Sequence, residues 1–154
     1  MSQLPITSKG MAKLKDELYR LQTVDRPEVI KAIEEARAHG DLSENAEFHA
    51  AKDRQNEIMN RINTLQNMIG ESRVVEIKGP YTKCVFGATF TMVNLETDEE
   101  RTYTLVGPHE SDPQNGFLSL AAPIGRAVTG LVEGDDFFLT TPGGEEEYRI
   151  VSVS

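Results

Sequence analysis

The stretch Gly40-Asp41-Leu42-Ser43-Glu44-Asn45 decides how this chain of 154 residues folds, because helix-like apolar periodicity leads into it from both sides. Apolar residues three or four positions apart lie on one face of a helix. On the N-terminal side these residues are Met11, Leu14, Leu18 and Leu21. On the C-terminal side they are Phe48, Ala51, Ile58, Ile62, Leu65 and Ile69. Each series forms a narrow apolar seam between charged residues, as in a coiled coil.

The two seams can be paired as facing sides of an antiparallel hairpin, in which the numbers of opposed residues have a nearly constant sum. Three pairs each sum to 83, and they are Leu14 with Ile69, Leu18 with Leu65, and Leu21 with Ile62. The midpoint then lies between Asp41 and Leu42. Gly40 is independently typical of a position just past a helix end. Both signals predict the tip of the hairpin at residues 40–45.

Local signals mark the other helix boundaries of the hairpin. Thr7 and Ser8 are good N-cap residues for a helix that begins near Lys9. Pro27 lacks an amide hydrogen and disfavours helix at the residue before it, so we expect a kink there. Gly70 indicates the end of the second helix. The sequence therefore predicts an antiparallel coiled-coil hairpin over residues 1–76.

The second half of the chain, residues 77–154, has the shorter alternating patterns of β-strands. Residues 85–95, 101–106, 117–120, 136–140 and 147–153 are expected to form strands, and residues 123–130 a short helix with proline near its start. The fold class is therefore α+β. A small, mostly antiparallel sheet domain with one short helix follows the hairpin.

Composition excludes several classes of function. The net charge is −9, which argues against binding to duplex nucleic acid through broad phosphate neutralisation. Residues 1–76 carry 11 basic against 13 acidic side chains, and residues 77–154 carry 5 against 12. We expect no membrane span and no secretory signal, because every apolar run is short. The single cysteine, Cys84, fits a reducing compartment and is expected to be a buried small residue.

The carboxylates of the tip allow two interpretations. Asp41 and Glu44 are spaced like an N-cap and its partner in a capping box, and Asp41 or Ser43 could cap the second helix. The same two carboxylates could instead converge on one Mg²⁺ ion, which prefers oxygen ligands and often takes only one or two from the protein. A zinc site with His39 and His49 lacks any supporting motif.

The chain resembles the Gre family of bacterial transcript-cleavage factors, GreA type. The resemblance is carried by DRPEVI at 25–30, EARAHGDLSENAEFHAA at 35–51, and short runs at 86–88, 106–107, 122–127 and 141–144. These runs occur in the family's order along essentially the whole chain, and the run across the tip is highly specific.

The resemblance implies a partner and a mechanism. The coiled coil would enter the secondary channel of RNA polymerase, and the second domain, FKBP-like in fold, would dock at the rim of that channel. Asp41 and Glu44 would help to hold a Mg²⁺ ion of the polymerase active centre, so that polymerase cleaves the 3′ end of a backtracked transcript. The protein would have no cofactor of its own.

Further expectations follow from the same resemblance. A basic patch on the hairpin would contact the nascent RNA, with Arg37, Lys52 and Arg54 as candidates. We expect a cytoplasmic protein that acts as a monomer, without membrane contact. One alternative is a channel-binding transcription inhibitor of the same fold. Another is a self-contained nuclease or prolyl isomerase.

Overall fold

The computed structural model describes residues 3–40 and 45–154. The backbone groups into two compact units, one formed by Met11–Glu71 and the other by Met1–Gly10 together with Ser72–Ser154. The domain boundary that we predict between residues 76 and 77 is a statement about which segments fold independently. This grouping describes contacts within the folded chain, so the boundary stays a prediction. Among the described residues, no helix combines the length and the apolar character needed to cross a membrane.

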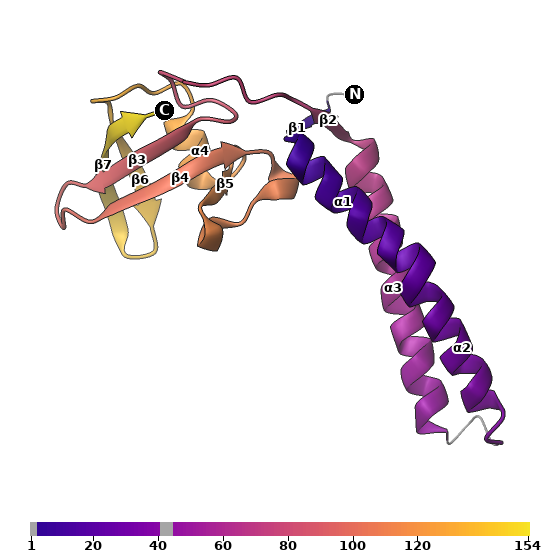
Figure 1. Cartoon of the computed structure of the whole chain (residues 1–154). Helices are drawn as coiled ribbons and strands as arrows, with labels where there is room; N and C mark the ends of the chain where they lie inside the picture. The colour runs from indigo at the N-terminus through magenta and orange to yellow at the C-terminus, as the bar shows by residue number, and fades with distance from the viewer. Residues whose placement is uncertain (1–2, 41–44) are drawn as a thin grey trace. The chain divides into compact units, whose positions relative to one another are not determined.

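The predicted helical hairpin is confirmed. Its first arm contains α1 (Ser8–Arg20) and α2 (Arg26–Arg37), and its second arm is α3 (Ala46–Gly70), which packs along α2 (Figure 1). The seam between the arms is a small apolar cluster made of Val29, Ile33, Ala51, Ile58 and Ile62, with Leu18, Leu21 and Phe48 against it. Leu65 is fully buried as well. Of the residues in the predicted pairing, Leu14, Ile62 and Leu65 are buried, Leu18 and Leu21 pack against the cluster, and Ile69 is half-buried.

An ion pair supports the hairpin outside this seam. The Arg61 guanidinium on α3 donates from Nε to Glu17 Oε2 of α1 over 2.6 Å and from Nη2 to Glu17 Oε1 over 2.9 Å. This bidentate contact lowers the pKa of the Glu17 carboxyl. Both side chains are more than two-fifths exposed, so the pair adds little to stability.

The interruption predicted at Pro27 takes an unexpected form. Residues Leu21–Asp25 are π-helical, and α2 begins directly after them with Pro27 in its first turn. Arg26 keeps a helical backbone with φ −64° and ψ −48°, so the expectation that proline would disfavour helix there is wrong. A wider helical turn before a proline can absorb the missing amide hydrogen without ending the helix.

The start of α1 is capped from two directions. Thr7 is the predicted N-cap, and its hydroxyl accepts a hydrogen bond of 3.0 Å from the Gly10 amide. The amide and hydroxyl of Thr7 donate to the two carboxylate oxygens of Glu110, each over 2.5 Å. In a capping box the second role belongs to a glutamate three residues after the cap. Here that position is Gly10, and Glu110 occupies the space that its side chain would fill.

The second unit is built on a five-stranded sheet of order β5-β4-β3-β7-β6, which Figure 1 shows beside α4. Its elements are β3 (Thr89–Asn94), β4 (Glu100–Val106), β5 (Phe117–Ser119), α4 (Pro123–Val128), β6 (Asp136–Thr141) and β7 (Gly144–Val153). Three of the strand pairs are antiparallel and β5 runs parallel to β4, so the sheet is mixed and, as expected, mostly antiparallel. The short helix predicted near Pro123 is confirmed as α4.

Four short elements were not predicted from the sequence with their correct roles. Strand β1 (Leu4–Ile6) pairs in parallel with β2 (Ser72–Val74), which brings the N-terminus into the second unit. Two single-turn 3₁₀ helices, η2 (Pro108–Glu110) and η3 (Pro113–Asn115), lie between β4 and β5. A three-residue strand has too few positions for an alternating pattern to show, which explains why β1 and β2 were missed.

The core of the sheet unit contains the single cysteine. Its largest fully buried side chains are Phe90, Met92, Leu105, Val128 and Ile150, and Cys84 packs among them. Cys84 has no exposed surface. Burial, with a smaller contribution from the charge of Asp135, raises the pKa of the Cys84 thiol to about 11. The prediction of a buried cysteine is confirmed.

This environment predicts that Cys84 is unreactive in the folded protein. A thiol becomes nucleophilic as the thiolate, which is scarce at pH 8 when the pKa is about 11. Labelling with an aromatic disulfide reagent at pH 8 should be far slower than for the same chain in denaturant, which serves as the control. Labelling of the native chain at the rate of free cysteine would contradict the prediction.

Candidate functional site at the hairpin tip

The two predicted tip carboxylates, Asp41 and Glu44, lie outside the described residues. The structure describes the chain on either side of them, where α2 ends at Arg37 and α3 begins at Ala46. Gly40 has a φ of +105°, in the left-handed region that favours glycine. The residues that link the two arms are therefore those that the seam pairing predicted.

Asn45 joins the two arms next to the tip carboxylates. It is the N-cap of α3, and its Oδ1 accepts a hydrogen bond of 3.1 Å from the Phe48 amide. The other end of the same side chain reaches α2, where Nδ2 donates to the Ala36 carbonyl over 2.6 Å. The interpretation in which Asp41 or Ser43 caps this helix is therefore wrong, because Asn45 holds that position.

Sequence reasoning missed Asn45, although a signal was present. Asparagine is among the best N-cap residues, and Asn45 directly precedes Ala46 and Glu47, which favour a first helical turn. The bond to Ala36 could not have been found in this way. It depends on how closely the two helix ends approach, which no local pattern encodes.

A second contact crosses the tip through two exposed side chains. His39 Nδ1 lies 3.3 Å from Glu47 Oε2, and the two side chains are 62% and 73% exposed. The contact is an ion pair only when the imidazole is protonated, and solvent screening at this exposure keeps its contribution small. Among the described residues, which do not include Asp41 and Glu44, no group of three histidine, cysteine or acidic side chains could hold a metal ion.

One flank of the hairpin near the tip carries a groove between α2 and α3. It is lined by small apolar side chains and by charged ones. The lining residues are Glu28, Val29, Ala32, Glu47, Ala50, Ala51 and Arg54. Arg54, one of the candidate RNA-contacting residues, therefore shares this flank with two carboxylates, which reduce the local positive potential.

The other two candidate RNA-contacting residues lie away from this groove. Lys52 is two positions before Arg54 on α3, which places it about 200° around the helix axis. Arg37 is five positions after Ala32 on α2, a rotation of about 140°. Lys52 also bonds Gln55 on its own helix over 3.2 Å. The structure therefore does not bring the three basic residues together on one face.

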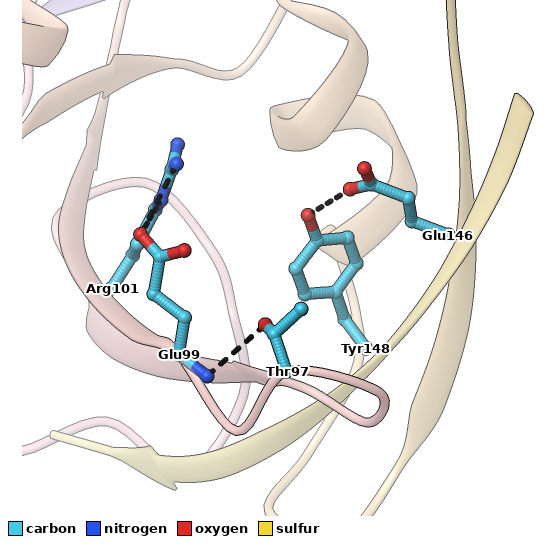
Figure 2. Close-up of polar contacts among 5 residues, drawn as sticks. All are labelled: Thr97, Glu99, Arg101, Glu146 and Tyr148. Atoms are coloured by element: carbon cyan, nitrogen blue, oxygen red, sulfur yellow. Dashed lines mark hydrogen bonds and ion pairs between the residues drawn. The ribbon is translucent and has the colours of Figure 1, made fainter. Parts of the chain in front are cut away.

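The sheet unit has its own polar cluster near the β3–β4 turn (Figure 2). Tyr148 on β7 donates its hydroxyl to the Glu146 carboxylate, and this bond together with burial raises the pKa of Tyr148. Arg101 contacts Glu99 over 3.4 Å, and Thr97 accepts from the Glu99 amide over 3.3 Å. These contacts join neighbouring residues of the turn and strands, so they support the sheet without forming a convergent site.

Known protein families match the chain along most of its length. A family described as "Transcription elongation factor, N-terminal" covers residues 4–74. A second, described as "Transcription elongation factor, GreA/GreB, C-term", covers residues 70–154. Together they span both units.

Curated relatives match over nearly the full chain. Transcription elongation factor GreA of Cereibacter sphaeroides is 48% identical over 153 residues, covering 99% of this chain and 98% of that protein. The GreA protein of Xanthomonas axonopodis pv. citri is 47% identical over 152 residues, covering 97% and 96%. Among solved structures, a Thermus thermophilus GreA factor homologue is 24% identical with a TM-score of 0.46. The match covers 99% of this chain and 99% of the homologue.

The backbone at the tip predicts contrasting effects of two glycine substitutions. Gly40→Ala should lower the free energy of unfolding by about 1 kcal/mol, because an L-residue is strained at positive φ. Among the described residues, no atom lies within 4 Å of the added methyl, so the loss is expected to come from this strain. The measurement is urea unfolding followed by helical circular dichroism.

Gly70→Ala is the matched control for this measurement. Gly70 is the last residue of α3, its added methyl also meets nothing within 4 Å, and its φ is not positive. Alanine there should leave stability unchanged or raise it by up to about 1 kcal/mol. Equal losses from the two substitutions would show that Gly40 does not need its left-handed backbone.

Proposed function

The chain belongs to the GreA/GreB family of transcription elongation factors, and we propose that it acts by carrying Asp41 and Glu44 into the active centre of RNA polymerase. As a member of this family it is an accessory factor of RNA polymerase and not an enzyme by itself. Its proposed action is to stimulate polymerase's own cleavage of backtracked nascent RNA, which restarts arrested complexes.

One observation carries the proposal. Helix α2 ends just before residues 38–45, and helix α3 begins just after them. The link between the arms therefore contains both carboxylates, and it lies at the end of the hairpin opposite Gly70. At about 1.5 Å per residue, the 25 residues of α3 extend about 37 Å. An arm made of only two helices is narrow, and an arm of this length can reach into a channel. We propose the secondary channel of polymerase as its target.

The donor set at the tip fits magnesium. Asp41 and Glu44 offer only carboxylate oxygens, which Mg²⁺ prefers, and two carboxylates leave the remaining positions to polymerase, RNA and water. When bound, Mg²⁺ would lower the pKa of a coordinated water and stabilise charge on the phosphate under attack. The chain itself would orient the two carboxylates. This division of ligands explains why the factor needs no metal cofactor of its own.

The remaining parts of the proposal concern partners and place of action. The sheet unit would dock at the rim of the channel, and the factor would act as a cytoplasmic monomer. Nascent RNA would be contacted near its 3′ end by basic side chains, electrostatically and without reading bases. Because Arg54 shares its flank with Glu28 and Glu47, we assign the stronger contact to Arg37 and Lys52.

A channel-binding inhibitor of the same fold is the alternative function. Such a protein would slow elongation without increasing cleavage. The two activities can be distinguished in one assay, because a backtracked complex reports both the shortened RNA and its later extension.

Loss of either tip carboxylate should reduce transcript cleavage. With a stalled, backtracked polymerase complex, Asp41→Ala and Glu44→Ala should each lower the cleavage rate by at least about 10-fold, because loss of a direct metal ligand should cost no less than the roughly 10- to 100-fold typical of losing a residue that only orients a ligand. Asp53→Ala removes an exposed acid from α3 and is the matched control. Cleavage by both tip variants at the wild-type rate would disprove the metal role.

Alanine substitutions of the basic residues should separate the two flanks. Arg37→Ala and Lys52→Ala should each slow cleavage by roughly fivefold, equivalent to about 1 kcal/mol for one exposed charge contact. Arg54→Ala should have a smaller effect, and Lys31→Ala, further from the tip on α2, should have none. The measurement is the cleavage rate at two salt concentrations. A dominant effect of Arg54→Ala would reverse the assignment of the RNA-contacting flank.

A further inference from the structure

We propose that Glu110 is a positioning residue that fixes the start of α1 within the sheet unit and thereby strengthens binding to polymerase. The proposal rests on the function proposed above, because it concerns how the hairpin and the sheet unit act on one partner. Glu110 itself is assigned no contact with metal, RNA or polymerase. Its basis is the pair of hydrogen bonds that the Glu110 carboxylate accepts from Thr7, the residue that caps the first helix of the hairpin.

The segment before α1 is built into the sheet unit. Residues 4–6 form β1, whose parallel partner β2 follows the last helix of the hairpin, and Ile6 is only 1% exposed. The Ile6 carbonyl accepts a hydrogen bond of 2.9 Å from the Val75 amide. A side chain at Gly107 would overlap the Pro5 carbonyl, so the two backbones pass in close contact just after β4 ends. The chain is therefore held in the sheet unit as far as Ile6.

Glu110 extends this attachment into the first turn of α1. It is the last residue of η2, and it is half-buried. One carboxylate oxygen accepts from the Thr7 amide and the other from the Thr7 hydroxyl, each over 2.5 Å. Hydrogen bonds to a charged group are about twice as strong as those between neutral groups. Thr7, Gly10 and Glu110 all belong to the compact unit that contains the sheet, and α1 continues beyond them into the hairpin.

The glycine at position 10 makes this arrangement possible. In a capping box the third helical residue is glutamate or glutamine, and it binds the N-cap amide from within the helix. Gly10 has that position here, and a methyl group on it would overlap the carboxyl group of Glu110. The Thr7 amide therefore has a partner from the sheet unit instead of a local one, and the first turn contains a weak helix former. A helix start that needed only a cap would not need this exchange.

The attachment should matter when both parts of the chain bind polymerase. Linked modules bind together more tightly when their connection is stiff and already in a competent arrangement. If the first turn of α1 frays, the connection gains conformations, and the fraction of chains that can bind with both parts falls. The apparent affinity falls by the same factor. Cleavage within the bound complex depends on the tip, so its rate should be unchanged.

The test compares Glu110→Ala with wild type in the free chain and with backtracked polymerase complexes. In the free chain, hydrogen exchange at the Thr7 amide should become faster, because that amide loses its acceptor. The factor concentration that gives half-maximal cleavage should rise about fivefold, equivalent to about 1 kcal/mol. The cleavage rate at saturating factor should stay at the wild-type value. Glu133→Ala, which removes an exposed glutamate from the sheet unit, is the matched control.

Two further variants separate attachment from capping. Gly10→Ala should displace the Glu110 carboxylate and weaken binding as Glu110→Ala does, although alanine is the better helix former. Its matched control is Gly70→Ala, whose methyl meets nothing within 4 Å. The double variant Glu110→Ala with Gly10→Glu supplies a local capping box, so exchange at Thr7 should be slow again. Because the attachment is still missing, its half-maximal concentration should remain raised.

Each outcome of these comparisons decides the question. Urea unfolding identifies the variants that fold, and Gly10→Ala replaces Glu110→Ala if the latter does not. The proposal is overturned if the folded variants need no more factor than wild type, or if the double variant regains wild-type affinity, since Glu110 would then be only a cap. Asp41→Ala, assayed in parallel, should cleave slowly at unchanged affinity. Normal cleavage by Asp41→Ala would reject the proposed metal role, whereas normal binding by the Glu110 variants rejects only this inference.

Discussion

The apolar seam between α2 and α3 is the contact on which the presentation of the tip depends. Val29, Ile33, Ala51, Ile58 and Ile62 are each less than a tenth exposed, although only two helices pack together here. A two-helix hairpin has no third layer to compensate for a lost contact, and short helices are marginally stable in isolation. The position of the turn, and with it the position of Asp41 and Glu44 between the arms, follows from which residues this seam can pair.

Because the seam is narrow, the helix ends contribute more than they would in a larger domain. At the start of α1, the hydroxyl of Thr7 caps the helix and the carboxylate of Glu110 binds Thr7. At the start of α3, Asn45 caps the helix and binds Ala36. In both places the local N-cap is supplemented by a bond to residues distant in sequence. A cap of either kind contributes about 1 kcal/mol, which is a large share of what so small a seam provides.

Much of this could be predicted from the sequence, and the remainder shares one physical cause. The helices, the turn at residues 40–45, the cap at Thr7, the end at Gly70 and most strands follow from periodicity and local propensities. The sequence could not reveal the bonds from Glu110 to Thr7 and from Asn45 to Ala36, the parallel pairing of β4 with β5, or the separation of Arg54 from Lys52. These features depend on how close two segments come in three dimensions. They also depend on which residues of another helix lie beside a given side of a helix.

The identity of the N-cap changes the weight of the two interpretations of the tip. From spacing alone, capping was a sufficient explanation of Asp41 and Glu44, because acids near a helix start satisfy its free amides and its dipole. In the structure Asn45 holds the cap of α3, and both acids precede it in the chain. Neither carboxylate is needed at the N-cap, so two charges in a short link between helices need another explanation. The metal coordination proposed above supplies one, since carboxylate oxygens are the ligands that Mg²⁺ prefers.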